Sequence, residues 1–170
     1  YDLNIQVVLA LQPSAMESWK KLCKTHSFNH SVKLVAGGLA RYHSVKNALD
    51  SINDYDGLVA IHDGVRPLVD SRIIGDSYTL AADKGSAIAS TELKESIRLT
   101  DNTTTYSLNR INYRLIQTPQ TFRTKLIKEA YAVIHYSDEL TDDASVAEKF
   151  GIPIHLFPGS YSNIKITSPD

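Results

Sequence analysis

The sequence is short of cysteine, of net charge and of long apolar runs. Among its 170 residues it has one cysteine, so no disulfide can form within the chain, and this usage suits a reducing compartment. The formal net charge is -1 and 22% of the residues are charged, which provides no bulk electrostatic attraction to nucleic acid or to an anionic membrane. No apolar run approaches the roughly 20 residues that a membrane-spanning helix needs. We therefore expect a cytoplasmic protein that acts on neither nucleic acid nor membrane.

A chain of this length can bury a sizeable core in a single domain. In its first half, short apolar segments alternate with segments that carry apolar residues at helical spacing. Strands are predicted over residues 5–11, 32–36, 58–61 and 86–91, and helices over residues 12–24, 41–52 and 72–84. This alternation through short loops predicts an α/β fold, here a single Rossmann-like domain with a mostly parallel sheet covered by helices.

Residues 92–117 interrupt this pattern. Two β-prone runs, Glu95–Thr100 and Thr103–Leu108, flank the turn signal Asp101-Asn102 and predict an antiparallel hairpin. A polar two-stranded ribbon is only marginally stable alone. We therefore expect an arm, inserted into a domain that spans residues 1–170, that packs against a second subunit.

The last part of the chain predicts two more helices and two more strands. One helix is expected to end near residue 135 and the other to span 142–150, with strands over 152–157 and 163–167. Thr141 is the predicted cap of the second helix. Asp142 and Asp143 follow in its first turn, where the helix dipole favours negative charge, so both carboxylates are expected to stabilise the helix end.

The most informative turn follows the third predicted strand. The apolar run Leu58–Ile61 ends abruptly in His62-Asp63-Gly64-Val65-Arg66-Pro67. An aspartate and an arginine three residues apart, at the carboxyl end of a buried strand, lie where open α/β sheets bind ligands. Gly64 allows close approach of the backbone to a ligand, and Pro67 fixes the exit of the turn. The alternative is an ordinary link between strand and helix with a surface ion pair.

A second turn, Gly37-Gly38, separates a predicted strand from the helix that begins near Arg41. It offers backbone N–H groups and a positive helix end to a ligand. This signal is weak alone, because neither a dinucleotide-binding nor a P-loop motif is present. Taken alone, the pair favours the alternative, a tight turn that needs two flexible residues.

The polar residues near the predicted turns favour charge recognition over covalent catalysis. No serine or cysteine stands in a recognisable nucleophile motif, and Cys23 lies in a predicted helix. The recurring groups are cations at Arg41, Arg66, Arg110 and Lys165, an acid at Asp63, and hydroxyls at Ser44, Ser96 and Thr118. In nucleotidyl or phosphoryl transfer the substrates supply nucleophile and leaving group, and the protein supplies position and charge.

Five motifs occur in a fixed order over essentially the whole chain. They are Gly37-Gly38-x-x-Arg41-x-x-Ser44-Val45-x-Asn47-Ala48-Leu49, Ile61-His62-Asp63-Gly64-Val65-Arg66-Pro67, Gln117-Thr118-Pro119-Gln120-x-Phe122, Thr141-Asp142-Asp143-Ala144-Ser145 and Asn163-Ile164-Lys165-Ile166-Thr167. Together they resemble the 2-C-methyl-D-erythritol 4-phosphate cytidylyltransferases of the non-mevalonate isoprenoid pathway. Ribitol-5-phosphate cytidylyltransferases share three of these motifs and are the alternative, although Ser44-Val45-x-Asn47 is more similar to the erythritol enzymes.

The resemblance implies an enzyme, a homodimer, in which the 4-phosphate of methylerythritol phosphate attacks the α-phosphorus of CTP, with Mg²⁺ on the triphosphate. It implies nucleotide contacts at Gly37, Gly38, Ser44, Asp63 and Gly64, and catalytic roles for Asp63, Arg66 and Lys165. It implies substrate contacts at Arg66, Thr118 and Lys165, with Ser96 and Arg110 on a dimer arm that reaches the neighbouring subunit's site. The resemblance assigns no metal ligand, and it leaves open whether Asp63 contacts the metal or a substrate hydroxyl.

The sequence also departs from the family pattern. Leu39-Ala40 stands where an acid usually follows the two glycines, and Ser96 stands where threonine is common. The family's N-terminal glycine-rich loop, which holds the triphosphate, is not in this sequence, which begins at Tyr1 and stops at a predicted helix start, Ser168-Pro169-Asp170. Both ends are therefore expected to be incomplete, and these residues alone are expected to bind CTP poorly. A non-catalytic nucleotide-binding subunit is the alternative if that loop is truly absent.

Overall fold

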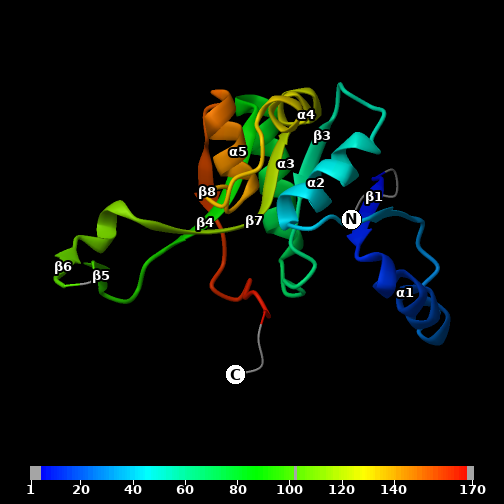
Figure 1. Cartoon of the computed structure of the whole chain (residues 1–170), viewed down its shortest axis with the longest axis horizontal. Coiled ribbons are helices and arrows are strands. Elements are labelled where there is room, and N and C mark those ends of the chain that lie inside the picture. The colour runs from blue at the N-terminus through cyan, green and yellow to red at the C-terminus, as the bar shows by residue number, and fades with distance from the viewer. Residues whose placement is uncertain (1–4, 102, 168–170) are drawn as a thin grey trace. The chain divides into compact units, whose positions relative to one another are not determined.

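A computed structural model describes residues 5–101 and 103–167, which form two compact units (Figure 1). Unit 1 comprises the described residues up to Gly57 together with Thr124–Ile152. Unit 2 comprises Leu58–Arg123 and the described residues from Pro153 onward. The predicted helix start at residues 168–170 and Asn102 of the predicted turn lie outside the described residues. The single domain over residues 1–170 stays a prediction.

Unit 1 is built from two parallel strands and four helices. Strands β1 (Val7–Leu11) and β2 (Val32–Ala36) pair in parallel, and the helices are α1 (Pro13–Thr25), α2 (Arg41–Asp50), α4 (Thr124–Val133) and α5 (Asp143–Phe150). Helix α4 packs against both α2 and α5. The buried side chains of these helices are mostly apolar, because each helix carries apolar residues at helical spacing; they include Leu49, Ile127, Ala130, Val146 and Ala147.

Unit 2 contains a four-stranded sheet in the order β3-β7-β4-β8 and one long helix, α3 (Ser71–Lys84). The strands are β3 (Leu58–Ile61), β4 (Ser86–Glu92), β7 (Arg114–Arg123) and β8 (Leu156–Pro158). Helix α3 contacts β3, β4, β7 and β8. Their common core consists of Ile73, Ala81, Ala87, Ala89 and Phe157. Ala87 and Ala89 of β4 are fully buried in this core, beside Ile73 and Ala81 of α3.

The sheet of unit 2 is mixed, whereas the alternation of strands and helices predicted a mostly parallel one. Strand β4 pairs in parallel with β8, but β7 is antiparallel to both β3 and β4. The cause is the inserted hairpin. Because the chain reverses direction within the insertion that follows β4, β7 runs back beside β4 and pairs with it in the antiparallel direction. Residues 163–167, predicted as a strand, have no regular secondary structure, and the strand predicted over 152–157 is the shorter β8.

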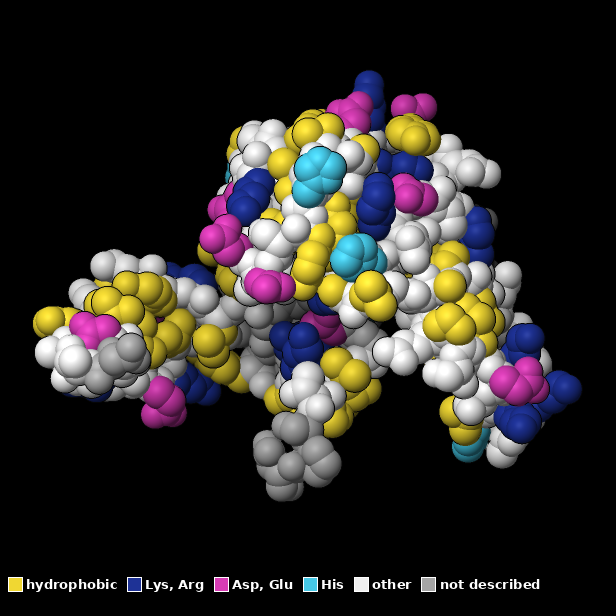
Figure 2. All heavy atoms as spheres, in the orientation of Figure 1, with side chains coloured by type: hydrophobic (Ala, Val, Ile, Leu, Met, Phe, Trp, Pro, Cys, Tyr) yellow, Lys and Arg dark blue, Asp and Glu magenta, His cyan; other side chains and the backbone are white. Residues whose placement is uncertain are grey.

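The predicted hairpin is present between β4 and β7. It consists of β5 (Ile97–Thr100) and β6 (Thr105–Leu108), followed by the 3-10 turn η1 (Arg110–Asn112). Figure 1 shows the hairpin at the end of the β4–β7 ribbon, and Figure 2 shows hydrophobic side chains gathered over it. The exposed apolar residues of this region are Leu99, Tyr106, Ile111, Tyr113, Leu115 and Ile116. We call β5, β6 and η1 the arm.

No helix within the described residues is long and apolar enough to span a membrane.

Candidate active site

The turn after β3 is closed by its own backbone and by the C-terminal segment. The Arg66 N–H donates to the Asp63 carbonyl at 3.0 Å, and the Ile166 N–H donates to the Val65 carbonyl at 2.9 Å. Among the residues that the structure describes, none apart from Gly64 and its two chain neighbours has an atom within 4 Å of the place where a Cβ on Gly64 would stand. Packing within the chain therefore does not require a glycine here, and its bare backbone faces open space.

Thr118 reaches this turn from β7. The pairing register of β7 with β4 shifts near this point, between the pairs Ile88–Gln120 and Ser90–Ile116, so β7 is irregular at Thr118. The Asp63 N–H donates to the Thr118 hydroxyl oxygen at 3.0 Å, and the same oxygen lies 3.0 Å from Nδ1 of His62. An irregular strand thus places a buried hydroxyl under the turn that carries Asp63.

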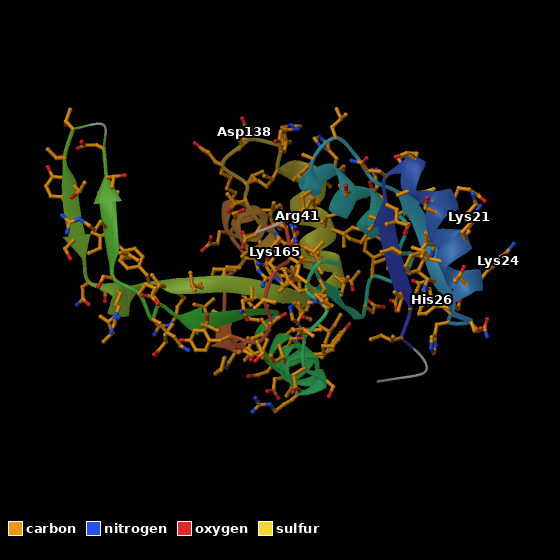
Figure 3. The ribbon with its side chains drawn as sticks, turned by 90° about the horizontal axis from the view of Figure 1, so that it is seen from below. Lys21, Lys24, His26, Arg41, Asp138 and Lys165 are labelled. Carbon is orange, nitrogen blue, oxygen red and sulfur yellow. The ribbon has the colours of Figure 1, made fainter. Side chains whose placement is uncertain are left out.

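Asp63, Arg66, Thr118 and Lys165 form one group, which we call the Asp63 cluster. The Lys165 Nζ lies 3.1 Å from Oδ2 of Asp63, and the Arg66 Nε lies 3.4 Å from the same oxygen. The Asp63 and Arg66 side chains are 11% exposed and that of Lys165 is 41% exposed; Lys165 is labelled in Figure 3. Two cations around one carboxylate leave a net positive charge, which favours an anionic ligand such as a phosphate.

Asn163 fixes the segment that carries Lys165, although this segment is not a strand. Its side chain is fully buried, and its Nδ2 donates to the Thr118 carbonyl at 2.8 Å. Its backbone carbonyl accepts a 2.7 Å hydrogen bond from Nη1 of Arg66. The Gln117 side chain holds the same segment through both the carbonyl and the N–H of Ser160, at 2.8 and 3.2 Å.

Sequence reasoning quoted Gln117 and Asn163 within motifs but gave them no role. The signal that could have found them is their amide chemistry: a side chain that both donates and accepts can bind two backbone groups of an irregular segment. Gly159 provides a further signal, because a Cβ there would stand 2.4 Å from Oε1 of Gln117. A side chain at residue 159 would displace the Gln117 amide from its position against Ser160, and its Cβ would lie 3.3 Å from the backbone N and O of Ser90.

In unit 1, the two glycines after β2 make a tight turn onto α2. The Gly37 N–H donates to the Leu11 carbonyl at 2.7 Å, and the Gly38 N–H donates to the Ser44 hydroxyl at 3.0 Å. A Cβ on Gly38 would lie 2.3 Å from Cβ of His43, so the close approach of turn and helix requires a glycine. Both N–H groups are used inside the chain, contrary to the expectation that they are offered to a ligand. Backbone carbonyl groups of this turn are therefore the groups that could accept a hydrogen bond from a ligand.

Arg41 is held by a buried carboxylate of the same unit. Its Nη1 and Nη2 donate to Oδ1 and Oδ2 of Asp143 at 2.9 and 2.6 Å, and the Tyr131 hydroxyl donates to Oδ1 at 2.7 Å (Arg41 is labelled in Figure 3). Burial raises the pKa of Tyr131 above its ordinary value, and the nearby charge of Asp143 acts in the same direction, so the hydroxyl stays a donor. Arg41, counted above among the cations suited to phosphate, therefore has a structural partner.

The two adjacent carboxylates at the start of α5 have different roles. Asp142 is the N-cap, its side chain accepting the Ser145 N–H at 2.9 Å in a capping box, so the cap lies one residue after the predicted Thr141. Asp143 is fully buried and pairs with Arg41. Only one of the two carboxylates thus has the capping role that was expected of both.

The remaining predicted residues, Ser96 and Arg110, lie at the arm and are exposed. Nη1 of Arg110 donates to the carbonyl of Lys94, which ties η1 to the irregular segment between β4 and β5. The predicted residues therefore fall into three groups. Asp63, Gly64, Arg66, Thr118 and Lys165 come together in unit 2, Gly37, Gly38 and Ser44 come together in unit 1, and Ser96 and Arg110 belong to the arm.

Within the part of the chain that the structure describes, no three histidine, cysteine, aspartate or glutamate side chains gather in a way that could hold a metal ion. The one carboxylate of the Asp63 cluster is already shared by a lysine and an arginine. These residues fit a divalent cation that arrives on the phosphates of a nucleotide, with its charge balanced there, better than one bound to protein ligands.

In this α/β fold, two cations and a carboxylate gather at the turn after the half-buried strand β3, which fits an enzyme of the nucleotidyltransferase class. Comparison with known proteins gives the particular family. The family model described as 2-C-methyl-D-erythritol 4-phosphate cytidylyltransferase matches residues 3–170, and the chain belongs to this family. The Rossmann-like α/β fold and the recognition of this family from its motifs are thereby confirmed.

Relatives of known name agree with this assignment. The 2-C-methyl-D-erythritol 4-phosphate cytidylyltransferase of Bacteroides thetaiotaomicron is 40% identical over 169 residues, which cover 99% of this chain and 76% of that protein. The enzyme of the same name from Porphyromonas gingivalis is 41% identical over 164 residues, covering 96% and 73%. The structure of 4-diphosphocytidyl-2C-methyl-D-erythritol synthase from Anaerococcus prevotii superposes with a TM-score of 0.84 at 26% identity, covering 96% of this chain and 73% of that one.

Proposed function

We propose that the protein transfers the cytidylyl group of CTP to 2-C-methyl-D-erythritol 4-phosphate, a step of isoprenoid precursor synthesis. The products are 4-diphosphocytidyl-2-C-methyl-D-erythritol and pyrophosphate. Family membership supports the reaction, and one observation within this chain supports the site: the Asp63 carboxylate lies between Lys165 and Arg66, 3.1 and 3.4 Å from their nitrogens.

In this reaction an oxygen of the sugar-alcohol phosphate attacks the α-phosphorus of CTP, and the bond from that phosphorus to the β-phosphate oxygen breaks. Negative charge is highest around the reacting phosphorus and the leaving pyrophosphate, so cations that are already in place stabilise the transition state. Lys165 and Arg66 supply this charge. Asp63 holds both cations in position and, with the bare backbone of Gly64, faces the ribose and the reacting phosphates.

The substrate phosphate is bound by Arg66, Thr118 and Lys165. The nucleotide base is assigned to unit 1, to the turn Gly37-Gly38 and to Ser44. Cytosine presents an exocyclic amino group as a donor, which needs acceptors such as backbone carbonyls. Because the two glycine N–H groups already donate within the chain, the carbonyl side of this turn is the suitable partner for that amino group.

Magnesium is proposed to enter with CTP, bound to the triphosphate, where it neutralises phosphate charge and draws electron density from the leaving group. No residue of the chain is proposed as its ligand.

The function is tested by assaying the full-length protein with CTP, Mg²⁺ and either 2-C-methyl-D-erythritol 4-phosphate or ribitol 5-phosphate, with pyrophosphate release as the readout. We expect kcat/KM for the methylerythritol phosphate to exceed that for ribitol phosphate by about 100-fold, as sites built around a particular polar substrate discriminate. A preference for ribitol phosphate would identify the protein as the alternative enzyme. Binding of CTP without turnover of either acceptor would favour a non-catalytic nucleotide-binding subunit.

The arm is proposed to form a homodimer, because a two-stranded ribbon with an exposed apolar surface is not stable in isolation. On its face are exposed Leu99, Tyr106 and Ile111, at 57%, 55% and 69% of full exposure. In this proposal Ser96 and Arg110 contact the substrate phosphate of the neighbouring subunit. Each active site then needs Asp63 from one chain and Arg110 from the other.

Mixing two inactive variants tests the dimer. Full-length Arg110→Ala and Asp63→Asn proteins, unfolded and refolded together in equal amounts, are expected to regain about a quarter of wild-type activity, since half of the dimers are mixed and each mixed dimer has one intact site. The control is each variant refolded alone. A mixture no more active than its parents, or a monomer in sedimentation at assay concentration, refutes a shared site.

A further inference from the structure

The hydrogen bonds around His62 determine the positions of two hydrogens, the ring hydrogen of His62 and the hydroxyl hydrogen of Thr118. The Thr118 hydroxyl oxygen accepts the Asp63 N–H at 3.0 Å, so its own hydrogen is available for one further partner. Nδ1 of His62 lies 3.0 Å from that oxygen, and Nε2 of His62 lies 3.2 Å from the Arg66 carbonyl, which can only accept. Nε2 must therefore carry the ring hydrogen, and Nδ1 accepts the hydroxyl hydrogen of Thr118.

This arrangement has a consequence for phosphate binding by Thr118. While His62 is neutral, the hydroxyl hydrogen of Thr118 is engaged by Nδ1, and the hydroxyl has no hydrogen to donate to a phosphate. The other neutral tautomer does not release it, because Nε2 without hydrogen would then face the Arg66 carbonyl, acceptor against acceptor. When a phosphate must also receive a hydrogen bond from Thr118, only the imidazolium form satisfies every group: Nδ1–H donates to the Thr118 oxygen, Nε2–H donates to the Arg66 carbonyl, and the Thr118 hydrogen turns away from the ring toward the phosphate.

We propose that His62 is a positioning residue that gates the Thr118 hydroxyl: uptake of a proton at Nδ1 frees that hydroxyl to donate to the acceptor's phosphate. The proton comes from solvent, and no covalent bond other than N–H changes. The inference rests on the proposed function, in which Thr118 binds the sugar-alcohol phosphate. It adds a residue to which the reading of the sequence gave no role, and it makes phosphate binding depend on pH.

The charges around the ring make this gate responsive to a ligand. More than a third of the His62 surface is exposed, yet both nitrogens have protein partners. Without ligand, burial lowers the pKa of His62 from its ordinary value, against hydrogen bonds and the charge of Asp63, which raise it; Arg66 lowers it further. Lys165, paired with Asp63, adds a second nearby cation. A phosphate dianion bound beside Arg66 and Lys165 offsets their positive charge and raises the pKa of His62. Phosphate binding and protonation of His62 therefore favour each other.

The first test is spectroscopic and needs no catalysis. In long-range proton–nitrogen correlation spectra of the full-length protein, with His62 identified by the loss of its signal in His62→Asn, the ligand-free ring is expected to carry its hydrogen on Nε2. Saturating 2-C-methyl-D-erythritol 4-phosphate is expected to raise the pKa of His62 by about one pH unit, whereas 2-C-methylerythritol without phosphate leaves it unchanged. A hydrogen on Nδ1 in the ligand-free protein overturns the proposal, as does a pKa that ignores bound phosphate.

The second test is kinetic and separates the gate from a merely structural role. The acceptor's phosphate itself gains a proton near pH 6, which affects wild type and variant alike. We therefore expect the ratio of acceptor KM in His62→Asn to that in wild type to increase about three- to fivefold as the pH falls from 8 to 6, while the same ratio for CTP stays constant. A pKa rise of about one unit sets a limit of about tenfold, and the lowered pKa of the ligand-free ring keeps the change at pH 6 below that limit. Thr118→Val is expected to reduce the ligand-induced rise of the His62 pKa to the part that the charge of the bound phosphate causes directly, because no hydroxyl then links the ring to the phosphate. A rise as large as in wild type would overturn the gate.

The two tests also distinguish this inference from the proposed function. Normal cytidylyl transfer with a KM ratio that is independent of pH overturns the gate and leaves the function intact. Absence of cytidylyl transfer in the full-length protein would overturn the proposed function. If the pKa of His62 still rises when the sugar phosphate binds, the gating role of His62 is supported even then. If that pKa does not rise, both the proposed function and the gating role are overturned.

Discussion

Full-length protein with Asp63→Asn is expected to fold normally and to lose about 100-fold or more in kcat, as losses of charge-positioning groups in active sites commonly do. The neutral amide keeps the shape of the side chain and the Asp63 N–H bond to Thr118, but it no longer attracts the two cations. The Lys165 side chain, which is 41% exposed, is then no longer held in place and becomes mobile in solvent. Ordering this cation during the reaction raises the activation free energy.

The stability of this variant should change little. Lys165, one partner of the carboxylate, is partly exposed, and ion pairs of this kind contribute about 1 kcal/mol or less. The other partner, Arg66, keeps its 2.7 Å hydrogen bond to the Asn163 carbonyl, so its largely buried guanidinium still has an acceptor. The measurements are single-turnover kinetics and urea unfolding. Asp70→Asn is the matched control: it makes the same chemical change in the same unit, at the N-cap of α3, where asparagine caps as well as aspartate. Near-wild-type kcat for Asp63→Asn would falsify the proposed site.

The part of the site that is local in sequence was predictable. A buried strand followed by an aspartate and an arginine three residues apart predicted the turn, and the structure shows that the two side chains do pair within it. The partner from Lys165 was not predictable from spacing, because about 100 residues separate it from Asp63 and its segment is irregular. Only the resemblance to a known family connected the two.

The fold shows the same limit. Alternating apolar and amphipathic segments predicted the class and the positions of most helices, because burial patterns repeat with the period of each element. The direction of β7 was not encoded in its own residues. It follows from the insertion before it, which turns the chain back beside β4, and no strand was predicted over the residues of β7.

The adjacent carboxylates of α5 show a signal that was present but unused. Successive residues of a helix point about 100° apart, so Asp142 and Asp143 cannot both face the same surroundings. Asp143 lies three and four residues before the buried Val146 and Ala147, which places it on the apolar face. A carboxylate on that face needs a buried cationic partner, and the arginine of α2 provides it.

That partnership predicts a large difference between two neighbouring substitutions. Asp143→Ala in the full-length protein is expected to lower the free energy of unfolding by about 3 kcal/mol, since removal of one partner leaves the other partly buried charge without its counter-ion. It also removes the acceptor of the Tyr131 hydroxyl. Asp142→Ala removes only a helix cap and is expected to cost about 1 kcal/mol.

Urea unfolding of both variants, followed by circular dichroism, measures the difference. A double-mutant cycle then assigns it to the ion pair: if Asp143 stabilises the protein mainly through Arg41, Arg41→Ala combined with Asp143→Ala should be no less stable than Asp143→Ala alone, because the guanidinium that lacked its partner is gone. Additive losses would mean that the two side chains contribute separately, and equal losses for the two aspartates would mean that Asp143, like its neighbour, stabilises only the helix end.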